Sequence, residues 1–177
     1  MKKQSIILIS CDHFEKDVTD NIVEAIIHEF QHPVVFKEYD FDLGNFYSPG
    51  RRQYDANSII KEVSNKILPD SFKKIGLFRV DLFIPILTYI FGQAILNGNT
   101  GIVSIYRLRN ELYGLKKSKT VESERLKKVV IHEIGHMFGL IHCSNPICVM
   151  RSSTYVEDID QKSENLCPKC KAEIRLI

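Results

Sequence analysis

Residues 132–142 read HEIGHMFGLIH, and this stretch decides the fold of the chain. It forms the end of the segment 122–140, which the sequence predicts to be its strongest helix. Acidic residues open that segment, where the helix dipole favours negative charge, and Gly139 stands at its end. Histidines four residues apart lie on one face of a helix, so both can reach a single metal ion. The glutamate between them falls beside that ion, where it can deprotonate a water molecule.

The pattern continues beyond the second histidine of this stretch. Gly139 can adopt the left-handed conformation that ends a helix and turns the chain sharply, so that a further histidine can swing back toward the same ion. Three histidine ligands leave a fourth position open for water, which distinguishes a catalytic zinc site from a structural one. The candidate ligands are therefore His132, His136 and His142, with Glu133 as general base. The alternative is a buried helix in which every specified position coincides by chance.

A second stretch, HEFQH at residues 28–32, carries the same short pattern without its context. Pro33 follows directly and biases His32 away from the helical region, so the helix is expected to end where a second ligand is needed. No glycine or third histidine follows at a useful spacing, and Glu38, which could ligate, falls in a predicted strand. We therefore interpret His28 and His32 as solvated side chains at an exposed helix end.

Four of the five cysteines follow the histidine stretch, in CSNPIC (143–148) and CPKC (167–170). Four thiolates can form a closed tetrahedral zinc site with no room for water. Such a site would hold the C-terminal segment, which is too short to build its own core, against the rest of the chain. Two disulfides or free thiols are the alternatives, and an intracellular location disfavours the disulfides. The candidate ligands are Cys143, Cys148, Cys167 and Cys170. Cys11, at the end of a predicted strand, is expected to be a core residue.

Composition and charge limit the partners of the protein. The chain has 177 residues, 44% of them hydrophobic, and a formal net charge of +2, which suits one compact domain (1–177) and demands no anionic partner. The N-terminus lacks the long apolar region of a signal peptide, and the apolar stretch 82–91 is about half the length needed to span a bilayer. We expect a cytoplasmic monomer that binds neither nucleic acid nor a membrane.

Apolar periodicity predicts strands that alternate with helices. Strands are expected at 5–10, 33–39, 74–84 and 101–108, a short strand or turn at 89–94, and helices at 17–30, 55–68 and 122–140. This alternation indicates an α/β (or α+β) fold with a sheet and crossover helices.

Met150 follows the last histidine of the stretch by eight residues. A methionine there could pack under the ligand histidines as a soft platform, although alone it would be interpreted as a core residue. HEIGHMFGLIH fits the extended signature of the metzincin zinc peptidases, and Met150 resembles the methionine of their Met-turn. With the four cysteines, the segment 132–170 resembles the archaemetzincins, and weaker likeness extends to 53–59, 79–85 and 91–108.

The resemblance implies a metzincin-like architecture. An N-terminal lobe (1–141) would hold a twisted mixed sheet, helices and the active-site helix, and a small Cys-rich C-terminal lobe (142–177) would be stapled by zinc. It also implies two zinc ions per chain, one catalytic and one structural, and hydrolysis of peptide bonds in a peptide or protein substrate. Some members are described as aminopeptidases, so action on short peptides is one expectation. An extended peptide would pair with an exposed edge strand, for which GIVSIYRL (101–108) is the candidate. Tyr155 either assists the oxyanion, as a tyrosine does in some metzincins, or is a packing or surface residue.

Two other interpretations stay open. A non-enzymatic zinc module that binds protein or nucleic acid would be favoured by CPKC and by the basic run LKKSKT (115–120). However, no aromatic residues interleave with that run, and a structural site has no use for a glutamate beside its histidines. A metzincin fold that binds zinc without peptidase activity is the second alternative.

We predict that the natively purified protein contains two zinc ions per chain, and that changing both His28 and His32 to alanine leaves this content unchanged. Elemental analysis of metal per chain measures both samples. Loss of a metal from the double variant would identify HEFQH as a metal site. A single zinc in the wild type would leave either the thiolate or the histidine site in doubt, and the Cys170→Ser variant separates the two.

Overall fold

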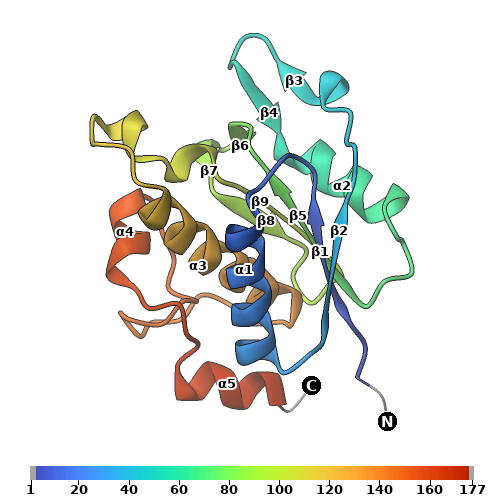
Figure 1. Ribbon diagram of the computed structural model, residues 1–177, viewed down its shortest axis with the longest axis vertical. Coiled ribbons are helices and arrows are strands. Elements are labelled where there is room, and N and C mark those ends of the chain that lie inside the picture. Colours follow the sequence, from blue (N-terminus) through green and yellow to red (C-terminus); the bar gives the residue numbers. More distant parts are fainter. Residues whose placement is uncertain (1–2, 176–177) are drawn as a thin grey trace.

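The computed structural model describes residues 3–175 and is built on a five-stranded mixed sheet with the order β2-β1-β5-β9-β8 (Figure 1). Four strands run parallel, and β8 joins the edge antiparallel to β9. Near-continuous apolar runs such as IILIS are typical of parallel strands that are covered on both faces. The strands are β1 (Ile6–Ser10), β2 (Val34–Glu38), β5 (Lys73–Phe78), β8 (Gly92–Ala94) and β9 (Thr100–Ser104).

Helices cover both faces of this sheet. Helices α1 (Lys16–Phe30) and α3 (Lys119–Met137) pack side by side on one face, and α2 (Ala56–Lys66) packs on the other (Figure 1). Short 3-10 helices span Gly44–Phe46, Tyr106–Leu108 and Asn110–Tyr113. The predicted helices at 17–30, 55–68 and 122–140 and the strands at 5–10 and 33–39 are thus confirmed within a few residues, as is the mixed α/β class.

A second sheet has the order β3-β4-β6-β7 and lies above the first in Figure 1. Its strands are β3 (Tyr47–Ser48), β4 (Gln53–Asp55), β6 (Leu82–Ile84) and β7 (Leu87–Ile90). The prediction of one strand over 74–84 is therefore wrong, because the chain leaves the first sheet after β5. Asp81 lies in the chain between β5 and β6 and is buried. Its carboxylate accepts two hydrogen bonds from the Arg107 guanidinium, at 2.7 and 2.5 Å. The short strand or turn predicted at 89–94 divides between β7 and β8.

The expectation that GIVSIYRL forms the exposed edge is also wrong. Strand β9 lies between β5 and β8, all five of its residues are buried, and the chain becomes a 3-10 helix at Tyr106. The alternation of polar and apolar residues suggested a half-exposed strand, but α3 and α2 cover both of its faces. The edge strand beside α3 is β8.

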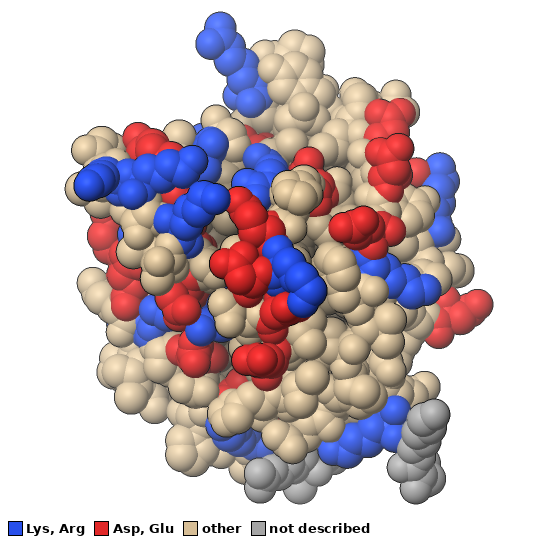
Figure 2. Space-filling view, viewed as in Figure 1, with Lys and Arg blue, Asp and Glu red and all other residues tan. Residues whose placement is uncertain are grey.

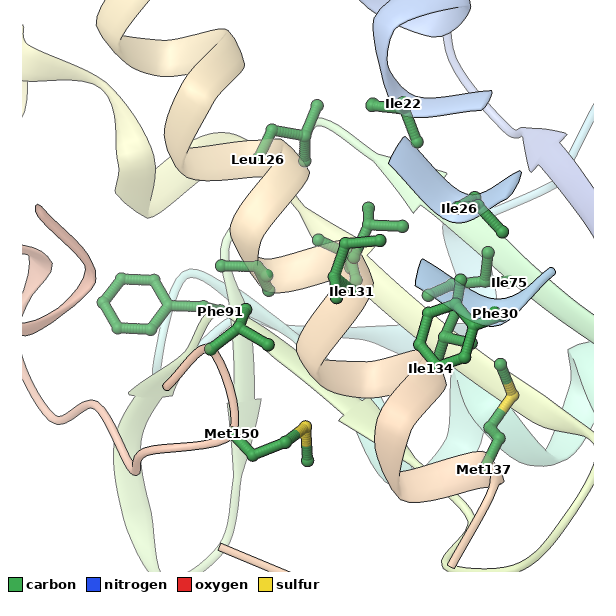
Figure 3. Close-up of a cluster of buried hydrophobic side chains, with 14 of the residues drawn as sticks. Ile22, Ile26, Phe30, Ile75, Phe91, Leu126, Ile131, Ile134, Met137 and Met150 are labelled. Carbon is green, nitrogen blue, oxygen red and sulfur yellow. The ribbon is translucent and has the colours of Figure 1, made fainter. Parts of the chain in front are cut away.

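The main core lies between the sheet, α1 and α3. Helix α3 is buried on nearly all sides in its second half, because the sheet and α1 flank it and the C-terminal segment packs against it. Figure 3 shows side chains on both sides of this helix. Ile22, Ile26 and Phe30 of α1 lie on one side, and Phe91 and Met150 lie on the other. In the described part of the chain, no helix combines the length and apolar character needed to traverse a bilayer.

The C-terminal segment contains two short helices, α4 (Val156–Gln161) and α5 (Pro168–Arg175), and polar contacts hold it to the rest. Glu29 of HEFQH, whose side chain is 2% exposed, accepts hydrogen bonds from the Leu166 backbone N–H (3.0 Å) and from Lys171 Nζ (3.1 Å). The glutamate of the first HExxH pattern therefore connects α1 to α5.

We predict that Glu29→Ala lowers the free energy of unfolding by about 1–3 kcal/mol, because it leaves the buried Leu166 N–H without an acceptor and Lys171 without its carboxylate. Glu24→Ala, on an exposed position of the same helix, is the matched control. Urea unfolding measures both variants. Equal stability of the two would show that this contact does not hold the C-terminal segment.

Candidate metal centre

The end of α3 is shaped to bring three histidines together. Gly139 has a φ of +85°, its N–H donates to the His136 carbonyl, and the Leu140 N–H donates to the Gly135 carbonyl at 3.0 Å. This pair of hydrogen bonds is the Schellman motif, in which a left-handed glycine satisfies the last helical carbonyls. The chain therefore reverses as the sequence predicts, and His142 returns to the helix.

The ring nitrogens of His132, His136 and His142 converge within 4.8 Å of one another. His132 Nδ1 lies 2.8 Å from the Val149 carbonyl, and His136 Nδ1 lies 2.7 Å from the Leu140 carbonyl. A carbonyl only accepts, so both Nδ1 atoms carry the proton and both Nε2 atoms present a lone pair. Burial lowers the pKa of all three imidazoles, which keeps them neutral, the form that binds a metal.

Glu133 lies beside this group and is buried. Burial raises the pKa of its carboxyl to about 8, with Lys162 opposing the shift. Gly92 of β8 faces it at close range: a Cβ at that position would lie 2.8 Å from Glu133 Cγ. Only a glycine in the edge strand leaves room for this side chain, a requirement that the local sequence does not reveal.

The histidines and Glu133 open into a cleft of about 620 Å³. It is lined by residues 87–94, by residues of α3 and by residues 152–155. Lys162, which follows α4, also lines it and is 3% exposed. Sequence reasoning missed Lys162, because no spacing connects it to the histidine stretch.

The four C-terminal cysteines form a second cluster. Their sulfur atoms lie within 4.8 Å of one another, with 3.8 Å between Cys143 and Cys167 and 3.9 Å between Cys148 and Cys170. The thiols are free, so the alternative of two disulfides has no support here. Although burial alone would raise it, hydrogen bonds from the backbone and thiol of Cys170 and from the other thiols lower the pKa of Cys167 to about 7. Burial raises the pKa of Cys148 and of Cys170, so the shifts within the cluster oppose one another.

The remaining candidates lie apart from both clusters. Cys11 is buried in the core on the α2 side, as expected, and burial raises the pKa of its thiol to about 12. Helix α1 ends at Phe30, because Gln31 is left-handed, and His28 is exposed. The expectation of a solvated His32 is wrong, since its half-buried ring stacks on Phe72 at 5.0 Å and its Nδ1 contacts the Gln4 carbonyl.

Met150 packs under the active-site helix. It is fully buried, and a Cβ on Gly135 would lie 2.4 Å from its sulfur. Gly135 is the residue directly before His136, so the methionine fills the space that a side chain would occupy between the two helical histidines. The Cys143 N–H donates to the Met150 carbonyl at 2.9 Å, which joins this turn to the cysteine cluster.

Tyr155 lies at the rim of the cleft and is 63% exposed. Its backbone N–H donates to the Asp158 carboxylate at 2.9 Å, which starts α4. The side chain belongs to the surface of the cleft, and a role toward an oxyanion stays a prediction.

Comparison with known proteins agrees with this geometry. Residues 1–176 match the family described as Peptidase family M54. An archaemetzincin from Haloquadratum walsbyi is 42% identical over 127 residues, which cover 70% of this chain and 72% of that protein. The crystal structure of an archaemetzincin from Methanopyrus kandleri has a TM-score of 0.85 at 28% identity and covers 99% of this chain and 95% of that one. The archaemetzincin from Archaeoglobus fulgidus, crystallised in complex with malonate, has a TM-score of 0.79 at 28% identity, with coverage of 96% and 99%.

Fold and site thus define a metallopeptidase of the metzincin type. The chain belongs to peptidase family M54, the archaemetzincins, and is a zinc metallopeptidase. The expected family and fold are confirmed.

We predict that Gly135→Ala destabilises the protein by about 1–3 kcal/mol through overpacking against Met150, although alanine is the better helix former. Combined with Met150→Ala, the same change should cost less, because the space beneath the helix is then open. Thermal and urea unfolding of the four proteins in this cycle measure the coupling. Gly50→Ala, where an added Cβ meets no atom within 4 Å, is the control. Additive effects of the two substitutions would contradict the contact.

Proposed function

We propose that this chain hydrolyses peptide bonds at a zinc ion held by His132, His136 and His142, with Glu133 as general base. The observation that carries the proposal is the convergence of neutral imidazole nitrogens beside the buried carboxyl group of Glu133 in an open cleft. Three histidines leave a coordination position free, which suits a catalytic ion.

The donor set fits zinc on chemical grounds. The Nε2 atoms of His132 and His136 lie 3.0 Å apart. Since each Nδ1 donates to a carbonyl, two lone pairs face each other at this distance, an arrangement that a shared cation stabilises. Two nitrogens bound to one tetrahedral zinc would stand about 3.3 Å apart, close to what is observed. Zinc would supply Lewis acidity, which makes water a nucleophile near neutral pH and polarises a carbonyl.

The protein side of the reaction falls to Glu133. Its carboxylate would accept a proton from the attacking water and then deliver it to the leaving amine. The carbonyls of Val149 and Leu140 hold His132 and His136 in one tautomer, and Met150 supports the helix beneath them.

An extended peptide substrate has a strand to pair with beside this group. Strand β8 is at the edge of the sheet, and its residues line the cleft that contains Glu133. Edge strands bind peptides through main-chain hydrogen bonds, which place the scissile bond by register and not by side-chain identity. We propose that β8 takes the role expected of the segment 101–108.

We propose a second, structural zinc ion at Cys143, Cys148, Cys167 and Cys170. Tetrahedral zinc with bonds of about 2.3 Å to sulfur places neighbouring sulfurs about 3.8 Å apart. The contacts at 3.8 and 3.9 Å support this geometry. Backbone N–H groups of Asn145 and Cys167 also point at cysteine sulfurs, at 3.4 and 3.3 Å, and would stabilise thiolates. Reduced thiols suit the cytoplasmic location that we expect.

A nucleic-acid-binding role is less favoured. On the face in Figure 2, acidic and basic side chains are intermixed and do not form one basic surface. Aminopeptidase action on short peptides stays a narrower hypothesis. Among the described residues, Glu133 is the sole carboxylate that lines the cleft, so no second acid is there to hold a free amino terminus.

We predict that Glu133→Ala keeps its zinc content but lowers the rate of peptide hydrolysis by about 10²–10⁴-fold, the usual contribution of a general base. Glu124→Ala, on an exposed position of the same helix, should hydrolyse at the wild-type rate. Metal analysis and assays on a peptide panel measure the two properties. Unchanged turnover in Glu133→Ala would refute the assignment, and a wild type without hydrolysis would favour the inactive alternative.

A further inference from the structure

Lys162 is a buried cation that the proposed mechanism does not use. It directly follows α4, is 3% exposed, and lines the same cleft as Glu133 and the three histidines. Burying an ammonium group costs several kcal/mol unless a carboxylate or several hydrogen bonds compensate. A buried lysine in this cleft therefore needs an opposite charge or hydrogen-bond acceptors nearby.

The protein supplies little of that compensation. Lys162 Nζ donates one hydrogen bond, to the Arg151 carbonyl at 2.8 Å. Among residues 3–175, no carboxylate oxygen lies within ion-pair distance of it, and Glu133 influences it only through space. An ammonium group has three N–H donors. Only one of them has a protein acceptor among the described residues.

The position of Lys162 is held firmly. The adjoining α4 is docked on α3 through a bidentate pair between Arg125 and Asp160, at 2.7 and 2.6 Å. Lys128 Nζ also donates to the Ile159 carbonyl at 3.0 Å. A charge on such a support is preorganised for binding and needs little ordering when a ligand arrives.

The neighbouring surfaces fit a carboxylate on a short aliphatic stem. Val129 and Ile159 contribute apolar walls to the cleft. An ammonium group in a cleft with apolar side chains can bind a carboxylate through a charge-assisted hydrogen bond.

We infer that Lys162 is a specificity-determining residue that binds a carboxylate of the peptide substrate next to the scissile bond. This inference rests on the proposed function. Two sources share the chemistry: the side chain of an aspartate or glutamate, and the free carboxylate at the C-terminus of a short peptide. In either case the substrate carboxylate accepts a hydrogen bond from Lys162 Nζ.

The test compares acids with their amides on the zinc-loaded protein. Alanine-rich peptides carry either glutamate or glutamine at successive positions around the cleaved bond, and a second set ends in a carboxylate or a carboxamide. The wild type should favour the acid by about ten- to a hundredfold in kcat/KM, the usual value of a charge-assisted hydrogen bond. The set in which the preference occurs identifies the source of the carboxylate.

Lys162→Met should reduce the acid-to-amide ratio to about one, whereas Lys61→Met, at an exposed position on α2, should retain the wild-type ratio. If Lys162→Met does not fold, Lys162→Gln carries the same test, since it also removes the charge but keeps a polar side chain that can donate hydrogen bonds. A ratio of one in the wild type would overturn the inference. So would an equal loss for acid and amide in the variant, which would assign Lys162 to support of the chain at Arg151.

Binding provides a readout that does not depend on turnover. Fluorescence anisotropy of labelled acid and amide peptides is measured on zinc-loaded Glu133→Ala, with and without Lys162→Met. Tighter binding of the acid that disappears with Lys162→Met supports the inference even if no peptide is cleaved, so its failure and that of the proposed function are distinguishable. Equal affinities for acid and amide would refute it.

Discussion

The turn at Gly139 is the constraint on which the site depends. The left-handed glycine lets the Leu140 N–H return to the Gly135 carbonyl, while the Leu140 carbonyl accepts from His136. One short segment therefore ends the helix, fixes the tautomer of the second histidine and directs His142 to the other two. Without the reversal, the third imidazole would continue away from the helix and the group would lack its third nitrogen.

The C-terminal segment has too few residues for a core of its own, and it packs against the main core instead. Its buried side chains are part of the main core cluster around α3. Its four cysteines lie close together, as in small domains that a metal stabilises in place of a large apolar core. Polar contacts also hold the segment in place. Glu29 accepts a hydrogen bond from Lys171 of α5, and Arg125 donates to Asp160 of α4. Because Cys143 directly follows His142, the cysteine cluster also positions the third histidine. The two clusters are thus parts of one arrangement.

Much of this could be predicted from local patterns. The spacing of the histidines, the glycine after them and the cysteine pairs each describe residues within one or two turns of chain, and the structure brings these residues together. Helix periodicity located α1, α2 and α3 for the same reason. The prediction failed where two alternatives shared one local pattern. An alternating strand can be an edge or an interior strand, and β9 proved to be interior because helices cover both of its faces.

The sequence by itself determined which residue types stand at metal-ligand spacing, since residue type and spacing are properties of neighbouring residues. It also predicted that HEIGH, and not HEFQH, is the metal site, because a proline and a glycine act on the residues next to them. Only the tertiary structure decided which strand borders the cleft, that Gly92 leaves room for Glu133, and that Lys162 lies in the same cavity. These relations join segments that are distant in the chain, and packing of the whole core, not any local spacing, brings them into contact.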